Sequence, residues 1–133
     1  MTFIDSNIPM YVAGADHPHK APATRFLESV AAGRVEACTS TEVLQEILFR
    51  YAGMERLNLA RKVYGIFVRL CPVVLPVELP DTDLAVEILG RVPGVSVRDA
   101  LHAAVMSNHG VEEIATFDRG FTRIPGIKIR PLT

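Results

Sequence analysis

Short apolar runs alternate along this chain with longer stretches in which apolar residues recur at helical spacing. The short runs are typical of buried strands, and the longer stretches are typical of helices with one apolar face. The predicted strands are Thr2–Ile4, Val35–Cys38, Val73–Val77, Ile114–Phe117 and Ile127–Ile129. The predicted helices are a short one from Pro9 to about Val12, then Ala23–Ala32, one opened by Thr39–Glu42 that reaches Tyr51, Met54–Leu70, one capped by Asp81 that reaches Val92, and one from Ser96 to about His109. This alternation predicts an α/β fold, a three-layer α/β/α sandwich with a mainly parallel central sheet.

Two of the predicted strands end on an aspartate. Asp5 follows Thr2–Ile4, and Asp118 follows Ile114–Phe117. In a parallel α/β sheet the functional crevice lies beyond the carboxyl ends of the strands, so the two side chains meet if these strands are neighbours. Carboxylates brought together repel one another and need shared protons, basic partners or a bound cation. A hard divalent cation with oxygen ligands meets that need.

Two predicted helices carry further acids near their first turns. Ser96 is a good N-cap, and Asp99 follows three residues later, where its charge meets the exposed N–H groups of the helix. Glu42 fits a capping box, whereas Glu46 lies one turn deeper, where it could pair with Arg50. Helix geometry alone does not choose between the two glutamates, and each of these acids also has a purely structural explanation.

The bulk properties describe one ordinary globular domain. A chain of 133 residues is long enough for a substantial core, and we expect a single domain over residues 1–133. The net charge of −1 gives no broad basic surface, although a local basic patch is possible after Asp118, where Arg119, Arg123, Lys128 and Arg130 follow without an acid. No apolar run has the length of a membrane span, and nothing resembles a signal peptide, so we expect no membrane association and a cytoplasmic location.

The cysteines and one pair of histidines are expected to have structural roles and no catalytic or metal-binding role. Cys38 and Cys71 are isolated and lack the spacing of a zinc site, which favours reduced thiols in the core. His17 and His19 have a His-x-His spacing but lie in a predicted loop without a third ligand, so we expect an ordinary surface loop. Phosphate-binding glycine motifs, a nucleophile elbow and a reactive Cys-His pair are absent from the sequence, which argues against nucleotide cofactors and acyl-enzymes.

Four segments give the chain a resemblance to the PIN-domain nucleases, and more closely to the VapC-like toxins of bacterial toxin–antitoxin pairs. They are FIDSN, TSTEVLQEIL, RDALHAA and ATFDRGFTRIPGI, which fall in the order of the family and span nearly the whole chain. The resemblance implies a Mg²⁺ or Mn²⁺ site held by four acids, Asp5, Glu46, Asp99 and Asp118. It selects Glu46 over Glu42, and it implies that Asn7 and Thr116 are polar supports of the site.

One position departs from the family pattern, because Gly120 stands where many similar proteins carry a further aspartate. The missing aspartate bears on the binding of a second metal ion more than on the binding of the first. His102, three residues after Asp99, is expected to be a satisfied helix histidine and to lie outside the metal site.

The activity that the resemblance implies is that of an endoribonuclease. A divalent ion held by the four acids lowers the pKa of bound water for attack on a phosphodiester, and similar enzymes leave a 5′-phosphate and a 3′-hydroxyl. The substrate would be single-stranded or looped RNA, whose backbone could contact the nearby Arg98, Arg119 and Arg123.

The resemblance also implies partners and leaves two other functions open. A cognate antitoxin would neutralise the toxin by covering the acidic site, and the toxin would form a homodimer, with the amphipathic helix around Val63 and Phe67 as a candidate surface. A catalytically inactive PIN-like module that binds proteins is one alternative, and metal binding without RNA cleavage would favour it. A metal-dependent phosphatase of small phosphate esters is the other, and turnover of a generic ester with RNA untouched would favour that.

Overall fold

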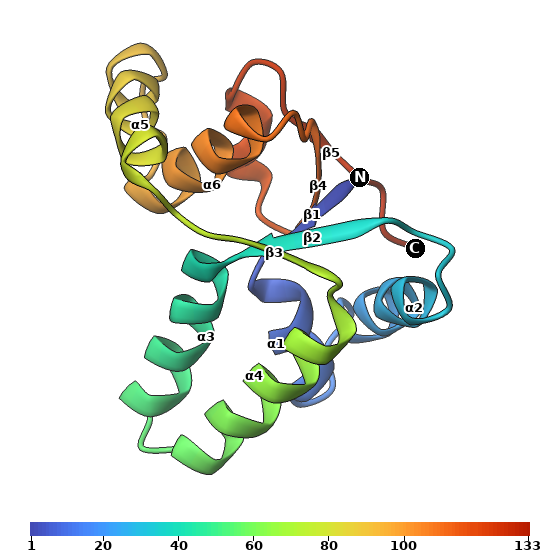
Figure 1. Ribbon diagram of the computed structural model, residues 1–133. Coiled ribbons are helices and arrows are strands. Elements are labelled where there is room, and N and C mark those ends of the chain that lie inside the picture. Colours follow the sequence, from blue (N-terminus) through green and yellow to red (C-terminus); the bar gives the residue numbers. More distant parts are fainter.

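Five strands form one sheet at the centre of the computed structural model, which describes residues 1–133 (Figure 1). They are β1 (Thr2–Ile4), β2 (Ala37–Ser40), β3 (Val73–Leu75), β4 (Glu113–Ala115) and β5 (Lys128–Ile129). The strands lie in the order β3-β2-β1-β4-β5, and every neighbouring pair is parallel. The predicted parallel sheet is confirmed.

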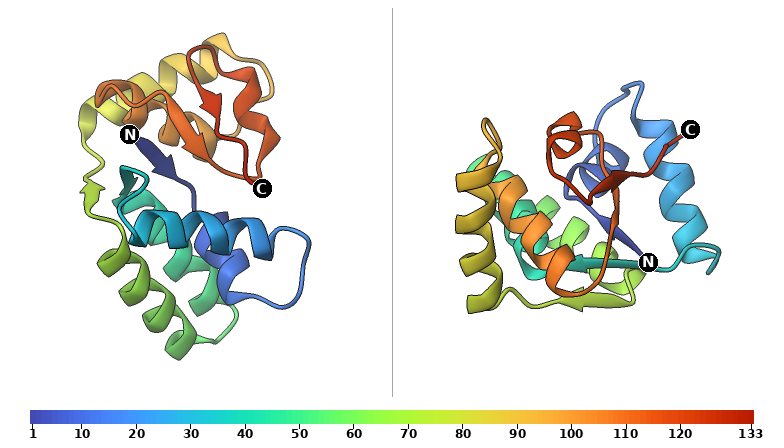
Figure 2. Two further views of the ribbon diagram at one scale, coloured as in Figure 1. Left: turned by 90° about the vertical axis from the view of Figure 1, so that its right-hand side faces the viewer. Right: turned by 90° about the horizontal axis from the view of Figure 1, so that it is seen from above.

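Helices cover both faces of this sheet, and Figure 1 and Figure 2 show the two layers from different directions. One layer holds α1 (Asn7–Ala13), α2 (Lys20–Ala31), α3 (Thr41–Gly53) and α4 (Leu57–Leu70). The other holds α5 (Leu79–Arg91) and α6 (Val97–Asn108), and the short 3₁₀ helix η1 (Arg119–Arg123) follows β4. The expected three-layer α/β/α sandwich is therefore confirmed.

The order of the strands creates a switch point beside β1. The chain runs from β1 to β2 and β3 on one side, and then crosses to β4 and β5 on the other. Ile4, the last residue of β1, pairs with Ala115, the last residue of β4. Ligands of open α/β sheets bind where the direction of winding reverses, at the carboxyl ends of the strands. The side chains that follow Ile4 and Ala115 therefore share the place where this architecture forms sites.

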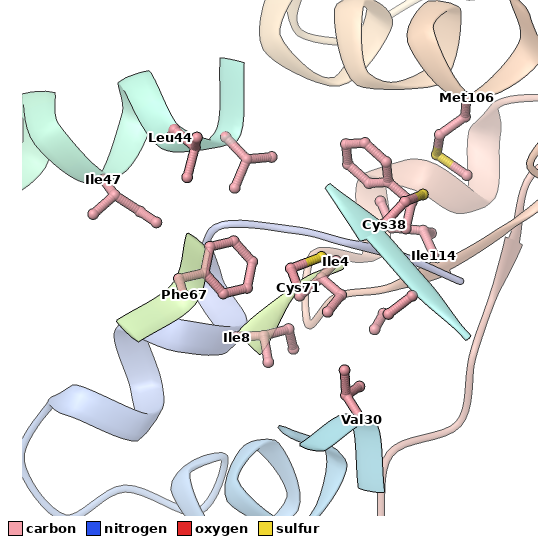
Figure 3. Packing of buried hydrophobic residues seen from close by; sticks show 14 of the residues in the cluster. Ile4, Ile8, Val30, Cys38, Leu44, Ile47, Phe67, Cys71, Met106 and Ile114 are labelled. Carbon is pink, nitrogen blue, oxygen red and sulfur yellow. The ribbon is translucent and has the colours of Figure 1, made fainter. Parts of the chain in front are cut away.

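Apolar side chains fill the space on both faces of the sheet (Figure 3). Ile4 of β1, Cys38 of β2 and Ile114 of β4 are fully buried. Met106 of α6 packs from one layer and Val30 of α2 from the other. Full burial of an aliphatic side chain contributes about 1.5–3 kcal/mol, so this packing holds the carboxyl edge of the sheet in place.

Both cysteines belong to this core. Cys38 and Cys71 are free and buried, and burial raises the pKa of the Cys38 thiol to about 12 and that of the Cys71 thiol to about 11. A thiol is reactive as the thiolate, so these side chains are inert at neutral pH. The expectation of reduced core thiols is confirmed.

The second strand lies further along the chain than its apolar run predicts. β2 ends with Thr39 and Ser40, which are polar but fully buried. The hydroxyl of Thr39 donates to the carbonyl of Ile4 at 3.0 Å, and Oγ of Ser40 accepts the N–H of Val43 at 3.3 Å as the N-cap of α3. Because these bonds satisfy both hydroxyls, the strand continues up to the first residue of α3.

The N-terminus of α5 differs from the expectation in its N-cap, which is Glu78. Asp81 takes part as the third residue of a capping box: its carboxylate accepts the Glu78 N–H at 2.8 Å, and it also accepts the side-chain amide of Asn108 at 2.8 Å, which ties α5 to α6. Val63 and Phe67 are only 6% and 1% exposed, because α4 packs against α1, α2 and α3, but both side chains line an apolar groove beside the exposed Ile66. A homodimer through α4 stays a prediction. No helix has both the length and the apolar character that crossing a membrane requires.

Candidate active site

Asp5 lies directly after β1, and neighbouring donors occupy both of its carboxylate oxygens. Oδ1 accepts the N–H of Ser6 at 2.7 Å. Oδ2 accepts the hydroxyl of Thr116 at 2.7 Å and the side-chain amide of Asn7 at 3.4 Å. Asn7 also donates to the Thr116 hydroxyl at 3.1 Å. The carboxylate is buried and held in one orientation by the start of α1 and the end of β4.

Glu46 comes to the same edge of the sheet from α3. Its Oε1 lies 2.7 Å from Nε2 of His102, a side chain of α6 that is fully buried. Its Oε2 lies 3.0 Å from Nε of Arg98, close enough for an ion pair but without the geometry of a hydrogen bond. The same Nε2 of His102 lies 3.8 Å from Oδ1 of Asp5. His102 therefore sits between two of the acids.

Asp99 and Asp118 face each other across Gly120. Asp99 lies in the first turn of α6, where its N–H donates to Oγ of Ser96 at 3.0 Å, as the N-cap prediction required. Oδ1 of Asp118 accepts the N–H of Gly120 at 2.8 Å. A Cβ at position 120 would lie 3.0 Å from Oδ1 of Asp118 and 3.0 Å from Oδ2 of Asp99. Gly120 thus keeps open the space between the two carboxylates.

The electrostatics of the site follow from this crowding of acids. Burial, and then the negative charges of Asp118 and Asp5, raise the pKa of Asp99 from 3.8 to about 6. Burial alone would lower the pKa of His102, but the hydrogen bond to Glu46 and the surrounding carboxylates outweigh it, so the pKa of His102 is raised. The raised pKa favours the protonated imidazole, whose positive charge would offset part of the negative charge of the neighbouring acids.

Comparison with known proteins identifies the family to which this site belongs. The family model described as PIN domain matches residues 2–127. The chain belongs to the PIN-domain family. A VapC ribonuclease of Mycobacterium bovis is 44% identical over 128 residues, which cover 96% of this chain and 98% of that protein. Ribonuclease VapC23 of Mycobacterium tuberculosis is 37% identical and covers 89% of this chain and 93% of its own.

Solved PIN-domain structures share the fold over almost the whole chain. The VapBC2 complex of Rickettsia felis, bound to a promoter DNA fragment, contains a chain with a TM-score of 0.78 at 17% identity, covering 99% of this chain and 98% of that one. VapC20 of Mycobacterium tuberculosis, a sarcin–ricin loop cleaving toxin, has a TM-score of 0.71 at 25% identity and covers 92% of this chain and 93% of its own.

The donors of this PIN domain fit a divalent cation. One ligand atom each from Asp5, Glu46 and His102 lie within 4.8 Å of one another. Beside them, Asp99 and Asp118 present oxygens on both sides of the gap over Gly120. Carboxylate oxygens are the ligands that Mg²⁺ and Mn²⁺ prefer, and the buried Oε2 of Glu46 has no hydrogen-bond donor of its own. The acids form two adjoining groups, with the charge of Asp5 acting on Asp99.

The three arginines predicted to meet RNA have different surroundings. Arg98 is paired with Glu46, although its side chain is more than half exposed. Nη1 of Arg123 donates to the carbonyl of Gly94 at 3.1 Å. Arg119 is exposed at the start of η1. Arg98 and Arg123 therefore already contact other residues of this chain.

His102 is the residue that the sequence reasoning left outside the site and that the structure places inside it. Its Nε2 contacts Glu46, and its Nδ1 is buried without a hydrogen-bond partner. Residues three apart share one face of a helix, so the spacing from Asp99 to His102 was the available signal. That spacing did not reveal the contact with Glu46, which comes from a different helix.

Proposed function

We propose that this chain is a metal-dependent endoribonuclease and the toxin of a toxin–antitoxin pair. The observation that carries the proposal is the convergence of acids from β1, α3, α6 and the end of β4 at the switch point of a PIN domain. The 44% identity to a VapC ribonuclease over nearly the full length supports the same activity.

In this proposal the metal is Mg²⁺ or Mn²⁺, held by Asp5, Glu46, Asp99 and Asp118. When bound, the ion supplies activation of water and charge neutralisation at the scissile phosphate. The protein contributes a fixed set of oxygens, because Thr116 and Asn7 orient Asp5 and because His102 and Arg98 orient Glu46. Outer residues that orient ligands typically change metal affinity by about 10–100-fold when they are replaced.

His102 contributes charge as well as orientation. It lies between Asp5 and Glu46 and favours its protonated form, so it limits the repulsion among the acids. Asp99 contributes a carboxylate whose pKa, raised to about 6 by burial and by the charges of Asp118 and Asp5, makes it gain a proton in mildly acidic solution. Binding of a divalent ion would have to remove that proton, so affinity should weaken below about pH 6.

The proposed partners follow from the relatives. Several similar solved structures are of VapBC or FitAB, and one from Klebsiella pneumoniae is described as a toxin–antitoxin complex, so we propose a cognate antitoxin that covers the acidic edge. A homodimer and a cytoplasmic location stay predictions. The exposed apolar side chains of α4 are Leu57, Tyr64 and Ile66, and this helix, with the groove that Val63 and Phe67 line, stays the candidate dimer surface.

Cleavage of a mixed RNA pool by the purified protein tests the proposal. We expect cleavage with Mn²⁺ or Mg²⁺, none with EDTA, and loss of activity to the EDTA background in Asp5→Asn. The matched control is Asp83→Asn, because Asp83 is an exposed aspartate of α5 outside the site. Full activity of Asp5→Asn would contradict the proposed role, and hydrolysis of a generic phosphate ester with RNA untouched would indicate a phosphatase.

A further inference from the structure

A pocket of about 420 Å³ with both apolar and charged side chains in its walls lies beside the acidic site, which it meets at Asn7. Its walls come from α1, the loop that follows it, the end of α3 and the start of α4. The side chains that matter for its chemistry are Tyr11, Asp16, His17, Arg50, Tyr51 and Arg56. None of them belongs to the proposed metal site, although the sequence suggested a local basic patch that includes Arg50 and Arg56.

Asn7 connects the pocket to the acids. It lines the pocket, and its side-chain amide donates to Oδ2 of Asp5 and to the hydroxyl of Thr116. The pocket therefore begins one side chain away from Asp5. An extended polymer that places one unit at the acids would place an adjoining unit here.

Aromatic rings line the path between the pocket and Asp118. The ring of Tyr11 lies 4.7 Å from that of His17 and 5.3 Å from that of Phe117, the residue before Asp118. The ring of His19 stacks on Phe117 at 4.0 Å with an interplanar angle of 8°. His17, which we expected to be an ordinary loop residue, is exposed within this cluster. Proteins that bind single-stranded RNA stack unpaired bases on rings of this kind.

The charges of the pocket suit a nucleotide as well. Arg50 and Arg56 are exposed and belong to none of the ion pairs or side-chain hydrogen bonds of the structure. Free guanidinium groups bind phosphate by two parallel hydrogen bonds. Asp16 adds one carboxylate, which repels phosphate but accepts hydrogen bonds from the amino groups of bases.

We propose that this pocket binds an unpaired nucleotide of the RNA next to the scissile phosphate. Its base stacks on Tyr11 and His17, and the backbone phosphate contacts Arg50 and Arg56. The proposal rests on the ribonuclease function and adds a site that selects which RNA is cut. Specificity then depends on the base beside the cleaved bond, because the rings and Asp16 meet that base.

Two measurements on the full chain test this site. The first is kcat/KM on a mixed RNA pool with Mn²⁺, with the cut positions mapped from the new 5′ ends. The second is the anisotropy of a labelled pool of short single-stranded RNA in EDTA, which reports binding without cleavage. The variants are Tyr11→Leu and the double replacement of Arg50 and Arg56 by alanine. Arg34→Ala is the matched control, because Arg34 is exposed before β2, at the opposite edge of the sheet from Asp5.

Tyr11→Leu should lower kcat/KM and RNA affinity about tenfold and change the base preferred beside the cut. The double arginine variant should weaken binding of all sequences and reduce the slope of log affinity against log salt by about 0.7 for each phosphate that the protein no longer binds. If Tyr11→Leu does not fold, the exposed arginines still decide the question. If the unmodified protein cleaves RNA and the variants keep its cut sites, RNA affinity and salt slope, the nucleotide pocket is overturned and the ribonuclease function is not. Variants that lose antitoxin binding but keep RNA binding would overturn the pocket in the same way. Absence of cleavage by the unmodified protein, with RNA binding still abolished in the variants, would overturn only the ribonuclease function.

Discussion

Replacing Asp99 with asparagine should stabilise the metal-free protein at neutral pH. Burial and the charges of Asp118 and Asp5 raise the pKa of Asp99 from 3.8 to about 6, so its ionisation costs more in the folded chain than in the unfolded one. A pKa difference of 1 corresponds to about 1.4 kcal/mol, so the gain in folding stability from Asp99→Asn has an upper limit of about 3 kcal/mol. Since Asp118 is only half-buried, solvent screens part of the repulsion, and we expect a gain of about 1–2 kcal/mol.

The pH dependence gives the sign of this effect. Below 3.8 Asp99 is protonated in both states and imposes no cost; between 3.8 and about 6 the unfolded chain releases the proton first, so stability falls as the pH rises. Above about 6 the full cost is present. His102 has a raised pKa, so its contribution is complete below its ordinary value of 6.5 and disappears only as the pH rises further. Below a pH of about 6 the difference between the Asp99→Asn variant and the unmodified protein is therefore free of the titration of His102.

Urea unfolding in EDTA from about pH 4 to about pH 7.5 measures the effect, because a shift of the midpoint at constant slope reports stability. Asp99→Asn should match the unmodified protein near pH 4 and exceed it at pH 7.5, and Asp83→Asn should follow the unmodified protein throughout. Saturating Mn²⁺ should reverse the order, since an ion at about 100 times its Kd adds about 2.7 kcal/mol to the protein that binds it. Parallel curves in EDTA, or an asparagine variant that is less stable at neutral pH, would refute the reasoning.

Three further outcomes are expected. Gly120→Ala should reduce metal-dependent cleavage and weaken Mn²⁺ binding measured by calorimetry, because a Cβ would lie 3.0 Å from one carboxylate oxygen each of Asp99 and Asp118, and these oxygens would have to shift. Gly90→Ala, with nothing within 4 Å, should leave both unchanged and stabilise α5 by about 0.5–1 kcal/mol. Thr116→Val removes the 2.7 Å hydrogen bond to the aspartate after β1 and should weaken Mn²⁺ binding about 10–100-fold, with the fold unchanged by circular dichroism. Cys38 and Cys71 should resist a thiol reagent until denaturant is added, since burial keeps both protonated; rapid labelling of the native protein would contradict this.

The sequence pattern predicted the layers and the position of the site because both depend on local signals. Each strand is a short apolar run, and Asp5 and Asp118 end two of them. That these two strands are neighbours did not follow from periodicity, since it depends on the pairing of Ile4 with Ala115 across more than a hundred residues. The resemblance to a family supplied that step and also selected Glu46. Helix geometry by itself had left Glu42 equally credible.

The residues that the pattern missed make contacts between distant elements. His102 acts through Glu46 on another helix, and Asp81, which resembled an N-cap, instead joins α5 to Asn108 of α6. The rings of His19 and Phe117 come together only after folding, because their segments lie about a hundred positions apart. No spacing rule predicts such contacts from one sequence.

The acids of the site destabilise the metal-free fold, whereas the apolar core and His102 stabilise it. The acids are costly neighbours, as the raised pKa of Asp99 shows, so the apolar core must hold the carboxyl edge of the sheet against their repulsion. His102 reduces that repulsion from inside the core, where its Nε2 contacts Glu46 although its buried Nδ1 has no hydrogen-bond partner, an unfavourable arrangement by itself. A divalent ion would remove most of the remaining cost. The same concentration of negative charge that weakens the metal-free fold therefore provides the free energy with which this site would bind its metal.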